Sequence, residues 1–334
     1  MNKKLTVGYL YGDATGIGPE ISAKALSDPE IRKLAKFIVV GDKRVLDYGI
    51  KIANVDLEYK VAEKFEDIDD TCDVWVLDQK NTNLDELSIG EVCAKSGKLS
   101  GENLIKAIDL AKEGKVDSVV YASMNKDALF KGGFEFKDDI TLLKDLFNHE
   151  GEYGEINVLD GKWYTRVTSH IPVSKIAEEI TKEAVLSKIH FAYENLKNAG
   201  IENPYIAVCG LNPHSGDNGL LGMEEIEEIS PAIEEAKKEG INIVGPYPAD
   251  TIFLRLKHEN YDCILSMYHD QGQIGMKLLG FERGVTIAGG LPVIITTPAH
   301  GTAFEIVGKG IANPGALKEA IKLNVKMTSE RMSK

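Results

Sequence analysis

Residues 6–20 read Thr6-Val7-Gly8-Tyr9-Leu10-Tyr11-Gly12-Asp13-Ala14-Thr15-Gly16-Ile17-Gly18-Pro19-Glu20. An apolar run, a glycine-rich turn and a proline near the helix start predict a β-strand that turns tightly into a helix. The N–H groups of a helix N-terminus favour an anion, so Gly12 and Asp13 are candidate cofactor contacts. The spacing differs from the dinucleotide-binding G-x-G-x-x-G pattern, and a purely structural turn explains these residues equally well.

Short β-rich runs and helical stretches alternate along almost the whole chain. The clearest predicted strands are residues 6–10, 37–40, 74–77, 118–121, 205–208, 241–244 and 263–266. The clearest predicted helices are residues 98–113, 175–198, 223–238 and 316–327. This alternation predicts an α/β protein in which helices cover parallel sheets.

One segment departs from the alternation. Residues 156–159 and 163–167 predict a β-hairpin joined by Asp160-Gly161-Lys162, which we interpret as a dimer arm or a sheet edge. Pro172 and Ser174 then precede the predicted helix 175–198, with Ser174 as a possible N-cap. No proline- or serine-rich linker divides the chain, so we expect a discontinuous first domain that the C-terminal segment completes.

The composition limits the class of protein. The 334 residues are 43% hydrophobic, which suffices for two domains or one elaborate domain. A net charge of -13 disfavours a nucleic-acid partner. The cysteines, Cys72, Cys93, Cys209 and Cys263, are far apart and predict reduced, mostly buried thiols. The sequence has neither a signal-peptide pattern nor a run of ~18 apolar residues, which predicts a soluble cytoplasmic protein with no membrane partner.

Three of the seven histidines stand where an apolar run meets a polar turn. They are His170, which follows Val167-Thr168-Ser169, His214 in Asn212-Pro213-His214-Ser215-Gly216, and His269 in Met267-Tyr268-His269-Asp270-Gln271. Neutral imidazole is a common zinc ligand, and three protein ligands with an open position suit a catalytic metal site. The alternative for each histidine alone is a hydrogen-bonded loop residue.

Two further places offer a cation to a substrate. Lys277 follows His269 by eight residues, and the charge of a nearby metal would make this lysine a proton acceptor. Asn125 and Lys126 end another predicted strand, where the lysine could meet a phosphate or a carboxylate. A solvated surface lysine is the alternative at both places.

Two glycine-bearing loops near the C-terminus could wrap a planar ring. They read His300-Gly301-Thr302-Ala303-Phe304-Glu305 and Gly308-Lys309-Gly310-Ile311-Ala312-Asn313-Pro314. These loops resemble the adenine-binding loops of the isocitrate and isopropylmalate dehydrogenase superfamily. Residues 12–20, Asn212-Pro213-His214, Gly245-Pro246-Tyr247-Pro248-Ala249-Asp250-Thr251 and residues 267–272 resemble the 4-hydroxythreonine-4-phosphate dehydrogenase family within it. The resemblance spans nearly the whole chain in order.

The resemblance implies an α/β fold of two α/β/α domains with a cleft between them. The expected NAD-binding domain comprises residues 1–128 plus 278–334, and residues 129–277 are expected to form a metal, substrate and dimerisation domain. The family oxidises a secondary alcohol of a phosphorylated four-carbon acid with NAD. It does so at a divalent-metal site that both subunits of a homodimer build.

The family pattern assigns roles to particular residues. It implies metal ligands at His170, His214 and His269, substrate contacts at His149 and Lys277, and cofactor contacts at His300, Gly301, Glu305 and Asn313. A carboxylate at Glu305 would accept a hydrogen bond from the ribose 2'-hydroxyl and repel a 2'-phosphate, which predicts NAD rather than NADP. Asp250 and Asp270 are expected to assist catalysis by orienting the histidines, with an ordinary cap or ion pair as the alternative.

Three substrate positions depart from the family pattern. Glu150 stands where the family has threonine, Thr286 replaces an asparagine, and Ile295 replaces an arginine. Loss of the arginine removes a bidentate anion clamp, so a different substrate is expected. Residues 294–300 resemble instead the branch that acts on D-threonate 4-phosphate or D-erythronate 4-phosphate. The segment from His149 to His170 is also shorter than in the family, which leaves the role of Glu150 open.

The implied reaction is oxidation of the 3-hydroxyl, with Lys277 assisting proton removal, followed by decarboxylation to dihydroxyacetone phosphate and CO2. Zinc is the first choice of metal, with cobalt, manganese, magnesium and nickel as alternatives. One rival interpretation is the dehydrogenase of vitamin B6 synthesis, which acts on 4-phosphohydroxy-L-threonine. The other is a non-catalytic metabolite-binding protein on the same fold.

Overall fold

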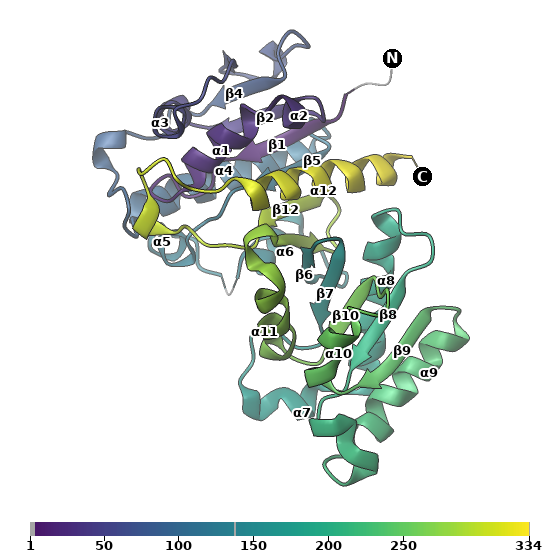
Figure 1. Cartoon of the computed structure of the whole chain (residues 1–334). Helices are drawn as coiled ribbons and strands as arrows, with labels where there is room; N and C mark the ends of the chain where they lie inside the picture. The colour runs from purple at the N-terminus through teal and green to yellow at the C-terminus, as the bar shows by residue number, and fades with distance from the viewer. Residues whose placement is uncertain (1–3, 137, 334) are drawn as a thin grey trace. The chain divides into compact units, whose positions relative to one another are not determined.

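The computed structural model describes residues 4–136 and 138–333. The chain forms two compact units, one of Met1–Gly151 with Glu282–Lys334 and one of Glu152–Phe281. The chain therefore leaves the first unit once and returns to complete it. Figure 1 shows the returning C-terminal segment, ending in helix α12 (Gly315–Met332).

The first unit is built on a mostly parallel sheet with the strand order β3-β4-β2-β1-β5-β12-β11. Only β11 runs antiparallel to its neighbour, β12. The strands are β1 (Thr6–Leu10), β2 (Lys36–Gly41), β3 (Lys60–Ala62), β4 (Val74–Asp78), β5 (Ser118–Tyr121), β11 (Val285–Gly289) and β12 (Ile294–Pro298). Their helices are α1 (Gly18–Leu26), α2 (Pro29–Arg32), α3 (Lys43–Ala53), α4 (Ala94–Lys112), α5 (Lys126–Lys131), α6 (Asp139–Phe147) and α12. Buried β-branched and aromatic side chains such as Val7, Phe37 and Val76 form its core with α1 and α12.

The second unit has a smaller sheet with the order β6-β7-β10-β8-β9. The pair β6 (Gly154–Leu159) and β7 (Lys162–Arg166) is antiparallel, as the predicted hairpin requires. Asp160 and Gly161 both have positive φ in its turn. The other strands, β8 (Tyr205–Cys209), β9 (Asn242–Tyr247) and β10 (Cys263–Ser266), run parallel to their neighbours. The helices are α7 (Ile176–Glu179), α8 (Lys182–Asn198), α9 (Ser230–Lys238), α10 (Ala249–Arg255) and α11 (His269–Gly280).

The observed architecture confirms the predicted α/β class, and all seven predicted strands are present. Two predicted helices are wrong in detail. The helix expected over 175–198 divides into α7 and α8, and α8 is capped by Thr181, whose hydroxyl accepts from the Ala184 N–H at 3.2 Å. Ser174 therefore does not cap it. The helix expected over 223–238 begins as a π-helical turn, Glu225–Ile229, before α9.

The boundary between the units also lies later than residue 128. Helices α5 and α6 group with the first unit because the segment 128–134 packs closely on α4. A Cβ on Gly97 would lie 1.7 Å from the Ala128 carbonyl oxygen, and one on Gly101 would lie 2.1 Å from the Phe134 ring. Glycines in an otherwise regular helix permit this approach, so residues 129–151 belong with the first unit.

The cysteines are free, and Cys93, Cys209 and Cys263 are buried, as the sequence predicted. Burial raises the pKa of Cys209 to about 12, so its thiol stays protonated and unreactive at neutral pH. Within the described residues, no helix combines the length and apolar character needed to cross a membrane.

Candidate active site

His170 and His269 lie side by side in the second unit. Their ring centroids are 5.7 Å apart. His170 follows strand β7, and His269 opens helix α11 after β10. These two strands are parallel neighbours, with Arg166 opposite Ser266, so their carboxyl ends meet at one edge of the sheet. The topology therefore brings together two of the three predicted metal ligands.

His269 is oriented by its neighbour. Its Nδ1 lies 2.7 Å from Oδ1 of Asp270, which leaves Nε2 as the nitrogen available to a metal. A carboxylate that fixes the tautomer of a histidine is the usual outer partner of a metal-binding imidazole. Asp270 therefore lies at the position from which a carboxylate can orient the His269 ring.

His214 lies in another loop of the second unit, after strand β8. It is exposed in the turn Pro213–Gly219, where His214, Ser215, Gly216, Asp217 and Asn218 have φ values of 54°, 52°, 79°, 44° and 56°. Within the described part of the chain, no three histidine, cysteine, aspartate or glutamate side chains gather as a metal site. Of the three predicted ligands, His170 and His269 are the two whose ring contact the described residues show.

A buried carboxylate fixes the unusual turn that carries His214. Glu225 is 2% exposed and accepts hydrogen bonds from the Asn212 N–H at 2.7 Å and the Asn212 side-chain amide at 3.0 Å. A Cβ on Gly216 would lie 2.7 Å from Glu225 Oε2, so only glycine fits there without a shift. The buried Glu225 side chain thus stabilises this left-handed turn through its contacts to Asn212.

Polar side chains that were not among the predicted site residues form hydrogen bonds with the segments that carry His170 and His269. Arg166, 5% exposed, donates to Ser169 Oγ at 2.8 Å, beside His170. Gln273 of α11 donates to Asn157 Oδ1 at 2.6 Å, which also accepts from Arg166 at 3.4 Å. The sequence held a signal, because Asn157 and Arg166 are polar positions within the two strands of the predicted hairpin.

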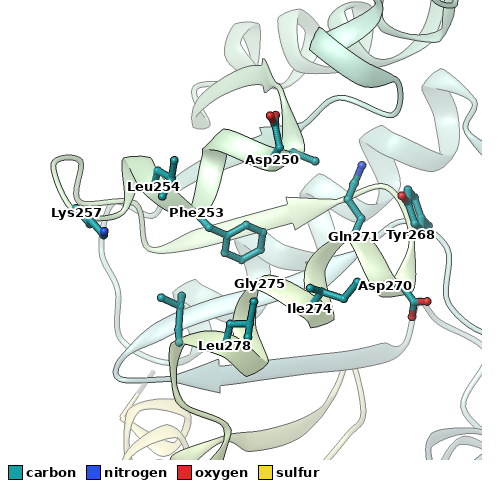
Figure 2. A pocket seen from close by; sticks show the side chains of 12 residues that line it. Asp250, Phe253, Leu254, Lys257, Tyr268, Asp270, Gln271, Ile274, Gly275 and Leu278 are labelled. Atoms are coloured by element: carbon teal, nitrogen blue, oxygen red, sulfur yellow. The ribbon is translucent and has the colours of Figure 1, made fainter.

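Helices α10 and α11 border a cavity of about 510 Å³ in the second unit (Figure 2). Its walls are mainly apolar, and Phe253 is one of the side chains that line it. Asp250 and Asp270, both predicted site residues, also line it. Ile274 is 61% exposed and Leu278 is 84% exposed, so the apolar face of α11 is open to solvent in the single chain.

Lys277 is exposed on the same helix as His269. Eight residues of α-helix rise ~12 Å, so the two Cα atoms lie about two turns apart along α11.

In the first unit, the predicted cofactor residues follow strand β12. The Ser123 hydroxyl donates to the His300 carbonyl oxygen at 2.5 Å, and Nδ1 of His300 lies 2.9 Å from the Gly301 carbonyl oxygen. His300 Nε2 is shielded from solvent and has no hydrogen-bond partner among the described residues. Glu305 is exposed, and Asn313 Oδ1 accepts from the Gly315 N–H at 2.9 Å at the start of α12.

Gly12 and Asp13 are enclosed by protein. Asp13 is 1% exposed, and its Oδ1 accepts from the Thr15 N–H at 2.9 Å, the Thr15 hydroxyl at 2.7 Å and the Ser96 hydroxyl. A Cβ on Gly12 would lie 2.4 Å from the Ala122 and Ser123 carbonyl oxygens. These contacts hold the turn in place, and the second carboxylate oxygen of Asp13, Oδ2, is buried without a hydrogen-bond partner among the described residues.

The remaining predicted substrate residues lie in the first unit. Asn125 caps α5, with its Oδ1 accepting from the Ala128 N–H at 2.9 Å, and Lys126 is exposed beside it. His149 follows α6, where its N–H donates to the Lys144 carbonyl oxygen at 3.0 Å, and Glu150 is exposed. Thr286 lies half-buried in β11.

Ile295 is fully buried in β12, beside Val119 of β5. The position at which the family pattern has an arginine is therefore filled by a core side chain.

A family model described as "Pyridoxal phosphate biosynthetic protein PdxA" matches residues 33–324. The chain belongs to the PdxA family. A Rhizobium meliloti member, provisionally named 4-hydroxythreonine-4-phosphate dehydrogenase 2, is 41% identical over 98% of this chain and 95% of its own. An Oceanobacillus iheyensis member, provisionally named D-threonate 4-phosphate dehydrogenase, is 42% identical over 96% of this chain and 97% of its own.

A PdxA-family structure from Salmonella typhimurium, provisionally titled a 4-hydroxythreonine-4-phosphate dehydrogenase, has a TM-score of 0.84 and 35% identity over 97% of this chain and 100% of its own. Isocitrate dehydrogenase from Methylococcus capsulatus has a TM-score of 0.51 at 14% identity, over 98% of this chain and 87% of its own, which shows a shared fold alone. The family expected from the sequence motifs is thus confirmed.

Proposed function

We propose that this PdxA-family dehydrogenase oxidises the 3-hydroxyl of D-threonate 4-phosphate or D-erythronate 4-phosphate with NAD. The resulting 3-keto acid loses its carboxylate as CO2 and gains a proton at C2, which yields dihydroxyacetone phosphate. The observation that carries the proposal is the buried Ile295, which presents no cation where the vitamin B6 branch has an arginine. The Oceanobacillus iheyensis relative, named for D-threonate 4-phosphate, supports the same choice.

We propose that His170 and His269 of one subunit hold a divalent cation with His214 of the partner subunit. The closeness of the His170 and His269 rings supports the choice of these two ligands. The cation, zinc or else cobalt, manganese, magnesium or nickel, would acidify the substrate alcohol and polarise the carbonyl that forms. Asp270 orients His269, Asp250 is proposed to support the same edge, and Lys277 accepts the hydroxyl proton.

The proposed homodimer has a suitable surface. The mainly apolar cavity bordered by α10 and α11 is a continuous apolar surface rather than a few scattered leucines. A second copy of the chain would bury this surface. We expect Leu278→Glu to convert the dimer to monomers, because a carboxylate would be desolvated at the centre of the contact. Light scattering after size-exclusion chromatography measures the mass. Phe130→Glu, at an exposed apolar residue of the first unit, is the control, and an unchanged mass for Leu278→Glu would reject this interface.

The proposed cofactor choice depends on Glu305. Its exposed carboxylate would accept from the ribose 2'-hydroxyl of NAD and repel the 2'-phosphate of NADP. We expect Glu305→Ala to lower the ratio of kcat/KM for NAD over NADP by about tenfold or more. The ratio is measured with both cofactors at one substrate concentration. An unchanged ratio would show that another residue selects the cofactor.

The decisive test of the function is a comparison of substrates. NADH formation is followed with D-threonate 4-phosphate, D-erythronate 4-phosphate and 4-phosphohydroxy-L-threonine, and dihydroxyacetone phosphate is measured with a coupled reductase. We expect one of the two sugar-acid phosphates to have the highest kcat/KM. A clear preference for the amino acid would favour the second candidate, vitamin B6 synthesis, which the name of the Rhizobium meliloti relative supports. No turnover with any of them would favour a binding protein, the third candidate.

The buried free thiols are consistent with the proposed cytoplasmic location.

A further inference from the structure

Helix α1 carries a partly buried ion pair that the proposed chemistry does not use. Glu20 is 3% exposed, and its Oε1 accepts from the Lys24 ammonium at 2.7 Å, one helical turn later. The same oxygen accepts from the Ala312 N–H at 2.8 Å, 292 residues away in the chain. A buried carboxylate needs such partners, because desolvation without them is costly. The pair therefore connects α1 to the loop that precedes α12.

Lys24 holds the same loop through its carbonyl groups. Its ammonium donates to the Gly310 and Ala312 carbonyl oxygens, both at 2.8 Å. With Glu20 it thus satisfies both the N–H and the C=O of Ala312, and hydrogen bonds to charged groups are the stronger ones. Two side chains of one helix thus hold Gly310 and Ala312, which lie within the loop 308–313.

This loop needs contacts that hold it in one conformation, because its glycines give the backbone high conformational freedom. Gly308 and Gly310 have φ of +75° and +71°, and glycine loses more conformational entropy on ordering than any other residue. The preceding loop is tied to the same helix start, where the Ile17 N–H donates to the Thr302 carbonyl oxygen at 3.0 Å. Both loops that the resemblance assigns to adenosine binding therefore form hydrogen bonds with the segment from Ile17 to Lys24.

We infer that Glu20 and Lys24 are positioning residues that hold the loop 308–313 in its nucleotide-binding shape before the nucleotide arrives. The inference rests on the proposed NAD function and deepens it. A loop ordered in advance spares the bound nucleotide the entropic cost of ordering it. The glycine-rich turn and its helix thus serve the cofactor indirectly, through the loops they support.

The test uses the full-length protein and two probes, NAD and ADP-ribose, with affinities measured by isothermal titration calorimetry. We expect Lys24→Met to weaken both probes by about tenfold, since loss of charged hydrogen bonds releases the loop. Amide hydrogen exchange should become faster at residues 308–313 in the same variant. Lys24→Arg, which can still donate to both carbonyl oxygens, should restore much of the affinity.

Glu20→Gln is the second variant, and it keeps the side-chain shape should Lys24→Met fail to fold. It should also weaken both probes, and kcat at saturating NAD should stay near the wild-type value while KM for NAD rises. Wild-type affinity in a folded Lys24→Met or Glu20→Gln variant would overturn the inference.

The Asn313→Ala variant distinguishes the positioning role of Glu20 and Lys24 from the proposed NAD-binding function. If it weakens NAD binding while the Lys24 and Glu20 variants do not, only the positioning role is wrong. If the wild-type protein binds neither NAD nor ADP-ribose, the proposed function and the inference fall together.

Discussion

Replacing His269 by alanine should remove the bound metal and lower kcat/KM on the order of a thousandfold or more, because the proposed site loses one of three ligands and the cation activates the alcohol. The structure gives His269 a position beside His170, with their ring centroids 5.7 Å apart. Metal content is measured by mass spectrometry after dialysis. Substitution with cobalt supplies a visible spectrum that reports the ligand set directly.

A graded series makes this result specific. Asp270→Asn keeps the His269 imidazole but replaces the carboxylate that lies 2.7 Å from Nδ1, so metal affinity should fall by roughly 10- to 100-fold. His258→Ala changes an exposed histidine of the same unit and should leave metal content unchanged. His214→Ala should behave as His269→Ala does. Full activity and metal content in His214→Ala would reject the three-histidine site.

Lys277→Ala should lower kcat by roughly 10²- to 10⁴-fold, the usual contribution of a general base, while NAD affinity changes little. His269 and Lys277 are separated by a rise of ~12 Å along α11, so the lysine could act either on the reacting hydroxyl or on a more distant part of the substrate. Separate values of kcat and KM distinguish these two roles. A lysine that accepts the hydroxyl proton acts on kcat. A lysine that only binds the far phosphate of the substrate raises KM and leaves kcat nearly intact.

The measurement is steady-state kinetics with the preferred 4-phosphate substrate, with NAD affinity determined separately. Lys238→Ala, at an exposed lysine of α9, is the matched control. A normal kcat in Lys277→Ala would move the role of the base to another group.

Periodicity and turn residues predicted most of the fold. The strands 6–10 and 118–121 match β1 and β5 at both ends, because buried parallel strands consist of short apolar runs between glycine or polar turns. The helix 175–198 failed at Ile180, whose φ and ψ of -86° and 82° interrupt the helix before Thr181. A tertiary contact selects that break, because Glu228 accepts the Lys182 N–H at 2.6 Å.

The site was predictable only in part, for a physical reason. His170 and His269 follow strands that prove to be neighbours, and a junction between strand and loop can be recognised from the sequence. The burial of Asp13 could not be predicted, because one of its partners, Ser96, lies 83 residues away. The support that Lys24 gives to Gly310 joins residues 286 apart, and no local pattern reports such a contact.

The return of the chain to the first unit has a consequence for synthesis on the ribosome. Strand β12 lies beside β5, yet it is translated after the whole of the second unit. A nascent chain that ends before residue 282 therefore has an open edge at β5, and open edges invite pairing with other chains. The second unit is continuous in sequence, so it can fold before the last two strands of the first unit have been translated. We expect truncation before β11 to yield aggregates rather than a smaller enzyme.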